Sequence, residues 1–120
     1  MEGEASGKRQ QRLDVCLALI TVRRLVGRYI GFELSADPVW DMLLDLYASD
    51  ARARNIAISS LASAANVPPT TALRAIKGMA ELGLVSRHSD PKDGRRIYIR
   101  LTPSAHEALA AIFDAIADGN

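Results

Sequence analysis

The chain has 120 residues, of which 48% are hydrophobic and 24% charged, and its formal net charge is +1. This composition fits one globular domain with one core and excludes a disordered chain. No apolar run approaches the ~18 residues that a membrane span needs, and the polar start does not resemble a secretory signal. Cys16 is the only cysteine, so an intrachain disulfide is excluded. We expect a single cytoplasmic domain over residues 1–120, with no membrane partner.

The charges are unevenly distributed along the chain. Residues 68–103 contain seven Arg or Lys and three Asp or Glu, whereas residues 31–50 contain five acids and no base. A near-neutral protein with one basic region can attract phosphate locally and still remain soluble. The distribution therefore indicates a nucleic-acid-binding segment in the second half of the chain.

The first predicted element is a long helix over about residues 8–34. Apolar residues mark two sides of it, with Leu13, Leu17, Ile20 and Leu25 on one and Val15, Leu19, Val22, Val26 and Tyr29 on the other. A helix that is apolar on two sides needs two surfaces to bury against, and in a small domain the second is often a partner subunit. We therefore expect a homodimer, with residues 8–34 and 103–118 as its dimerisation helices.

Asp37-Pro38 predicts the start of a second helix, because Asp caps free amides and Pro fits the first helical position. This helix should run to about Ala53, with Trp40 and Tyr47 in ordinary core packing. One side of it is an acidic row of Asp37, Asp41 and Asp45. Without a basic or histidine partner on the same helix, the row is interpreted as an exposed face and not as a catalytic pair.

Residues 55–58 are predicted to form a short edge strand, followed by a short helix that Ser59 or Ser60 caps. Asn66 tolerates a left-handed turn, and the two prolines after Val67 cannot continue a helix. The next helix is predicted over residues 69–82. We assign its inner face to Leu73, Ile76, Met79 and Ala80.

Gly83 should end that helix as its C-cap. Residues 84–88 and 96–101 are strand-like, and the turn between them contains an Asp-Gly pair, so a β-hairpin is predicted. Thr102-Pro103 should start a final helix. Its predicted apolar face consists of Leu109, Ile112, Phe113 and Ile116.

This order of elements is typical of a winged helix-turn-helix, a mainly α (α+β) fold with a two-stranded wing, a long N-terminal helix and one C-terminal helix. We expect residues 56–102 to form the DNA-binding core, with recognition helix 69–82 in the major groove and wing 87–100 on the minor groove. The candidate DNA contacts are Thr70, Thr71, Arg74 and Lys77 on the helix and Lys92, Arg95 and Arg96 on the wing.

The hairpin also resembles a known family. The stretches that carry the resemblance are Gly83-Leu84-Val85, Arg87, residues 90–96 and Leu101-Thr102-Pro103. They are similar to the winged-helix region of the MarR family of transcriptional regulators, whose wing motif is Asp-x-Arg-Asp-x-Arg. Asp90, Asp93 and Arg95 match that motif, and Lys92 stands where arginine is usual. The resemblance implies that Arg95 enters the minor groove, that an ion pair with Asp93 braces it, and that Arg74 contacts double-stranded DNA.

Other chemistry is weakly indicated. Cys16 lies between Val15 and Leu17, so a buried, inert thiol is expected and not a sensing one. His88 and His106 form no recognised metal motif and are expected to be solvated. No catalytic or phosphate-binding motif is present, so neither an enzyme nor a cofactor is expected. A small-molecule effector is left open without being indicated, and the alternative function is a protein-interaction module, such as an accessory subunit or antirepressor.

Overall fold

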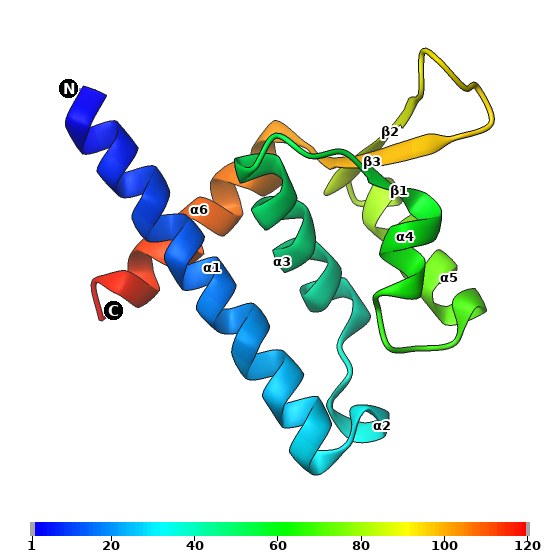
Figure 1. Ribbon diagram of the computed structural model, residues 1–120, viewed down its shortest axis with the longest axis horizontal. Coiled ribbons are helices and arrows are strands. Elements are labelled where there is room, and N and C mark those ends of the chain that lie inside the picture. The colour runs from blue at the N-terminus through cyan, green and yellow to red at the C-terminus, as the bar shows by residue number, and fades with distance from the viewer. Residues whose placement is uncertain (1, 120) are drawn as a thin grey trace.

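The computed structural model describes residues 2–119, so the two predicted domain limits, residues 1 and 120, lie outside the described residues. In chain order the elements are α1 (Glu2–Ile30), α2 (Phe32–Ser35), α3 (Pro38–Ala51), β1 (Ile56–Ala57), α4 (Ile58–Ser63), α5 (Pro69–Glu81), β2 (Val85–Ser89), β3 (Ile97–Leu101) and α6 (Pro103–Ala117). Helices α1 and α6 cross at one side of the molecule, and α4, α5 and the hairpin lie at the other (Figure 1). The predicted winged helix-turn-helix architecture is confirmed.

The N-terminal helix is shorter at its C-terminal end than predicted, because it ends at Ile30 and a separate turn, α2, follows. Gly31 has φ 117°, a conformation that favours glycine and cannot continue a right-handed helix. After this break, the ring of Phe32 folds back onto Gly27, where a Cβ would lie 2.0 Å from the nearest ring carbon. The close approach of α2 to α1 therefore depends on glycine at position 27.

The predicted helix caps are confirmed where a polar side chain precedes proline. Asp37 Oδ1 accepts a hydrogen bond from the Trp40 amide at 3.1 Å, and Thr102 Oγ1 accepts one from the Ala105 amide at 3.3 Å. The predicted serine cap of α4 is wrong, because α4 begins at Ile58 and no side chain caps it. Strand β1 runs directly into this helix, so the helix begins two or three residues earlier than a cap at Ser59 or Ser60 predicts.

The sheet has the strand order β1-β3-β2, with both pairs antiparallel. Hairpin pairing joins Val85 to Leu101 at one end and Ser89 to Ile97 at the other. The two-residue β1 pairs Ile56 with Ile99 and is an edge strand. The predicted hairpin and edge strand are therefore confirmed, and central strand β3 buries Ile99 against the helices.

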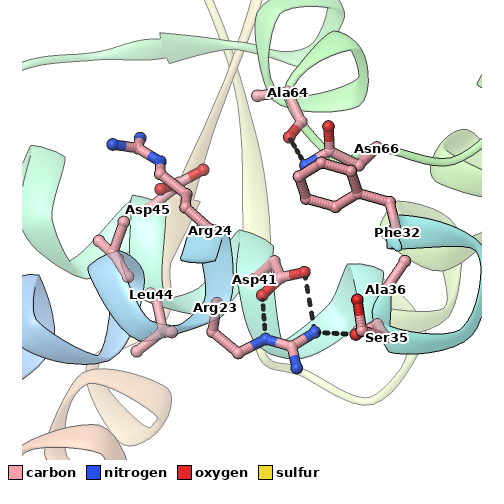
Figure 2. A pocket seen from close by; sticks show the side chains of 11 residues that line it. Arg23, Arg24, Phe32, Ser35, Ala36, Asp41, Leu44, Asp45, Ala64 and Asn66 are labelled. Carbon is pink, nitrogen blue, oxygen red and sulfur yellow. Dashed lines mark hydrogen bonds and ion pairs between the residues drawn. The ribbon is translucent and has the colours of Figure 1, made fainter. Parts of the chain in front are cut away.

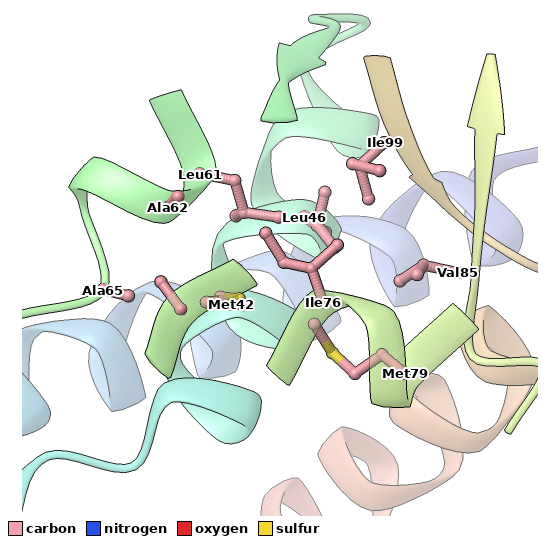
Figure 3. Close-up of a cluster of buried hydrophobic side chains, with 10 residues drawn as sticks. Met42, Leu46, Leu61, Ala62, Ala65, Ile76, Met79, Val85 and Ile99 are labelled. Atoms are coloured by element: carbon pink, nitrogen blue, oxygen red, sulfur yellow. The ribbon is translucent and has the colours of Figure 1, made fainter. Parts of the chain in front are cut away.

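A core of buried side chains holds α5 in place (Figure 3). These side chains come from α3, α4, the turn after α4, α5 and the sheet: Met42, Leu46, Leu61, Ala62, Ala65, Ala72, Ile76, Met79, Val85 and Ile99. The predicted inner face of α5 is wrong at Leu73, which is 47% exposed, whereas Ala72 is fully buried. The buried stripe thus passes on the other side of Leu73, because Ala72, Ile76 and Met79 follow i, i+4, i+7 spacing.

A second core lies between α1, α3 and α6 and is built on Cys16, Leu44, Tyr47, Ala48, Leu109 and Phe113. Helix α3 contributes to both cores, and its Leu43 packs against each of them. Helix α3 therefore packs against both the N-terminal helix and the winged-helix core. The predicted apolar face of α6 is only half inward, because Ile112 and Ile116 are exposed while Leu109 and Phe113 are buried.

Two predictions about polar side chains are wrong. Asp41 is not part of an unpaired acidic face, because Arg23 of α1 places its Nε 2.7 Å from Asp41 Oδ1. His106 is not simply solvated, because its ring stacks on Tyr47 with centroids 4.7 Å apart and its Nε2 lies 3.3 Å from Asp50 Oδ2. Both partners come from other helices, and local sequence spacing does not reveal such contacts.

Cys16 is fully buried, as predicted, and its Sγ donates a hydrogen bond to the Leu44 carbonyl at 3.3 Å. Burial, with a smaller contribution from the nearby Asp45 carboxylate, raises the pKa of Cys16 to about 12. A protonated, inaccessible thiol does not attack disulfide reagents.

We therefore expect no reaction of the native protein with a chromogenic aromatic disulfide at pH 8, and one equivalent of reaction in guanidinium chloride. Because the folded pKa is raised, the protonated thiol stabilises the fold fully below the unfolded pKa of about 8.5, and this contribution is lost as pH rises toward 12. Rapid reaction of the native protein would contradict the assignment of Cys16 to the core.

Candidate nucleic-acid interface

Helix α5 presents its polar face to solvent because its apolar stripe is anchored in the core. Ala72, Ile76 and Met79 are buried. The exposed residues on its other sides are Thr70, Thr71, Leu73, Arg74, Lys77 and Glu81. All four predicted contact residues of the helix, Thr70, Thr71, Arg74 and Lys77, are thus accessible. An exposed helix with hydroxyl and cationic side chains on one face fits the width and chemistry of the major groove.

The N-terminal turn of α5 adds backbone donors to this face. Pro69 occupies the first helical turn and no side chain caps the helix. The amides of Thr70 and Thr71 belong to this turn, where helix geometry supplies no carbonyl acceptor. Together with the positive end of the helix dipole, such amides favour a bound phosphate oxygen.

The tip of the wing is organised by Asp90. Its Oδ1 accepts a hydrogen bond from the Lys92 amide at 2.9 Å, and its Oδ2 accepts one from the Tyr98 hydroxyl at 3.1 Å. The hydrogen bond from the Lys92 amide is the main reason that the pKa of Asp90 lies below its usual value. Two backbone hydrogen bonds close the turn, one from Asp90 N to Arg96 O and one from Arg96 N to Asp93 O, and both are 3.0 Å long.

Asp93 holds the backbone and side chain of Arg95. Asp93 Oδ1 accepts a hydrogen bond from the Arg95 amide at 3.1 Å and lies 3.5 Å from Arg95 Nε. The Arg95 side chain is nevertheless 95% exposed, and Lys92 and Arg96 are exposed beside it. The wing therefore projects three cations into solvent from a hydrogen-bonded turn.

The predicted site residues fall into two groups, one on α5 and one on the wing tip. Both lie on the side of the molecule away from α1 (Figure 1). No hydrogen bond or ion pair between residues 2–119 joins the two groups. Each is held by its own scaffold, α5 by the core and the wing by β2–β3 pairing.

Two residues that organise or extend this interface are absent from the predicted contacts. Asp90 holds the wing turn, and its position before Pro91 is a sequence signal for such a side-chain-to-backbone turn. Leu73 lies exposed among the polar residues of α5 and had been assigned to the core. No local signal identifies it, because an apolar residue at this spacing is usually buried.

A pocket lies where α1, α2 and α3 meet the turn between α4 and α5 (Figure 2). Arg23 spans its floor, paired with Asp41 and donating to the Ser35 carbonyl. Phe32 and Asn66 border the other side, from α2 and from the α4–α5 turn. Asp45 also lines the pocket, and burial raises the pKa of its carboxyl group. The pocket therefore lies between the three N-terminal helices and the turn of the helix-turn-helix.

Residues 2–119 contain no cluster of three or more His, Cys, Asp or Glu side chains arranged to hold a metal ion. Among the described helices, none combines the length and apolar character that crossing a membrane requires.

Comparison with known proteins agrees with this geometry. Residues 48–105 match the family model described as a winged helix DNA-binding domain. That range begins near the end of α3 and includes α4, α5, the hairpin and the start of α6. No curated protein sequence matches the chain.

The solved structures that resemble the chain include a single-residue mutant of MepR from S. aureus, at 25% identity and TM-score 0.55 over 63% of this chain and 53% of that one. The chain therefore spans about half the length of this relative. MepR from S. aureus in a DNA-binding conformation has 20% identity and TM-score 0.58, over 86% of this chain and 76% of that one. The heme sensor PefR from Streptococcus agalactiae, in complex with heme, has 20% identity and TM-score 0.55, over 80% and 69%.

The wing motif, the element order and these structural relatives agree. The sequence resemblance to the MarR family is confirmed by this similarity: residues 48–105 match the model of a winged helix DNA-binding domain, and the chain is similar in fold to MepR and PefR.

Proposed function

We propose that the protein is a transcriptional regulator that binds specific double-stranded DNA sequences as a homodimer. In this proposal, α5 enters the major groove and the wing tip contacts the adjacent minor groove. The observation that carries the proposal is the exposure of Arg74, Lys77, Lys92, Arg95 and Arg96 on two rigidly held elements at one side of the fold. The MepR structure in a DNA-binding conformation has the same fold.

The homodimer is supported by the amount of surface that one chain leaves exposed. The chain exposes 7832 Å², about 1,500 Å² more than the ~6,300 Å² typical of a monomeric protein of 13.0 kDa. Its radius of gyration, 14.9 Å, likewise exceeds the ~13.6 Å expected for this length. A standard interface removes about 800 Å² from each partner, so the excess is sufficient for one dimer contact.

The apolar residues that would fill this contact lie on α1 and α6. Those exposed are Val22, Leu25, Tyr29, Ile30, Ile112 and Ile116. They belong to the helices that the sequence assigns to dimerisation, residues 8–34 and 103–118. Helices α1 and α6 cross at the side of the molecule opposite α5 and the wing (Figure 1). A two-fold axis there would leave two recognition helices free to bind two half-sites.

A charge in this face should separate the protomers. We expect Ile116→Glu to raise the dimer dissociation constant at least about a hundredfold, because an unpaired buried carboxylate costs several kcal/mol. Sedimentation equilibrium measures the change. Leu82→Glu, at a leucine 79% exposed beyond the end of α5, is the matched control and should remain dimeric. A wild-type protein that is monomeric at micromolar concentration would remove the homodimer from the proposal.

Selection of binders from a randomised duplex library, at near-physiological salt, tests the function as a whole. The proposal predicts a palindromic consensus with half-sites about one helical turn apart. Enrichment without a common sequence would indicate nonspecific, architectural binding. No enrichment would favour the alternative of a winged-helix protein-interaction module.

A further inference from the structure

Leu73 is an exposed apolar residue at the edge of the polar face of α5, beside the buried stripe of that helix. Its side chain is 47% exposed, whereas Ala72 and Ile76 beside it are fully buried. On a helix its surface neighbours are Thr70, three residues before it, and Lys77, four residues after it, and both are exposed. The α5 contribution to the core is complete without Leu73, since Ala72, Ile76 and Met79 fill it.

The major groove offers one apolar group on its base edges, the C5-methyl group of thymine. Apart from the C5–H edge of cytosine, which lacks the methyl group, the other base-edge groups there are hydrogen-bond donors or acceptors, and a leucine placed against one would leave a buried polar atom without a partner. Thr70, Arg74 and Lys77 can hydrogen-bond bases or phosphates, but Leu73 cannot. Leu73 is therefore suited to contact a thymine methyl group and is poorly suited to contact the polar groups of the base edges.

We propose that Leu73 is a specificity-determining residue that contacts the C5-methyl group of one thymine in each half-site. This inference rests on the proposed function, because it requires α5 to lie in the major groove. It adds the chemical class of base pair selected, an A·T pair with the thymine methyl toward α5. Arg74, one residue further along the helix, would lie next to this contact.

Single replacement of each thymine by deoxyuridine in the selected duplex tests the contact, because uracil pairs as thymine does and lacks only the methyl group. One position per half-site should lower wild-type affinity about fourfold, the effect of one buried methylene-sized group. Leu73→Ala changes both protomers of the proposed dimer, so it should weaken binding to the thymine duplex by about the square of that factor, roughly fifteenfold, and show no further loss with uracil there. Fluorescence anisotropy of labelled duplexes measures both.

Leu82→Ala is the matched control, since it removes an exposed leucine of the same segment that lies beyond α5. It should keep the uracil sensitivity of the wild type. The inference is overturned if no uracil substitution weakens the wild type, or if Leu73→Ala remains as sensitive to uracil as the wild type. In either case the proposed function stands, because the duplex is still bound. Failure to select any duplex would overturn the proposed function and this contact together.

Discussion

Replacing Arg95 with alanine is expected to weaken binding to every duplex by about a hundredfold or more, because one charge-assisted hydrogen bond, worth about 1.5–3 kcal/mol, is lost from each half of the proposed dimer. Arg95 is 95% exposed, and Asp93 holds both its amide and its guanidinium. Its side chain is therefore preorganised for the minor groove, where the negative potential is enhanced in A·T-rich DNA. The change should leave sequence preference largely unaltered, because such a contact reads groove shape and charge.

The same variant should flatten the salt dependence of binding. The slope of log affinity against log salt should become shallower by about 1.8, because each of two lost phosphate-proximal charges contributes about 0.9. Arg9→Ala, at an exposed arginine of α1, is the matched control and should retain the wild-type slope. Equal affinity and slope for Arg95→Ala and the wild type would remove the wing from the DNA interface.

Arg74→Ala should instead relax sequence preference if Arg74 reads a base.

Phe113→Ala is expected to lower the free energy of unfolding by about 3–5 kcal/mol. Phe113 is fully buried between α1, α3 and α6, and its ring meets Tyr47 edge-on with centroids 4.8 Å apart. The same cluster holds Cys16 and Leu44. Removing the ring therefore leaves a cavity at the point where three helices meet, and rigid neighbours close such a cavity only in part.

Urea denaturation followed by circular dichroism measures this loss. Glu107→Ala, an exposed substitution on the same helix, should stay within about 0.5 kcal/mol of the wild type. All variants are compared at equal protein concentration, because the proposed dimerisation would add a concentration-dependent contribution to stability. A loss below about 1 kcal/mol for Phe113→Ala would show that α6 packs less closely than this structure indicates.

The features of the fold that the sequence predicts correctly are set by local chemistry. Asp37 and Thr102 cap the helices that follow them, and the Asp-Gly pair at Asp93 lies in the hairpin turn. Asn66 has φ 58°, the left-handed conformation expected of it. In each case the residue acts on backbone atoms within a few positions of itself, so short segments contain the necessary information.

The errors arise where contacts between distant segments decide the outcome. Periodicity allowed Leu73 to face inward, but the positions of α3, α4 and the sheet made Ala72 the buried neighbour. Arg23 reaches Asp41 from α1, and His106 reaches Tyr47 and Asp50 from α6. None of these pairs lies within one helical turn, so no spacing rule could predict them.

The exposure of the candidate DNA contacts was more predictable than the core, because charged side chains seldom lie buried. Arg74 and Lys77 lie opposite the buried stripe of α5, and the wing cations follow from the hairpin motif. The support of the wing by Asp90 required the structure, since both of its partners had to be located.

Titration of ¹⁵N-labelled protein with the selected duplex, followed by amide chemical shifts, measures directly whether α5 and the wing together form the proposed DNA-binding surface. We expect the largest shifts in residues 69–82 and 89–97, with small changes on the exposed faces of α1 and α6. Shifts confined to α1 and α6, or a duplex bound with α5 and the wing unperturbed, would contradict the proposed surface.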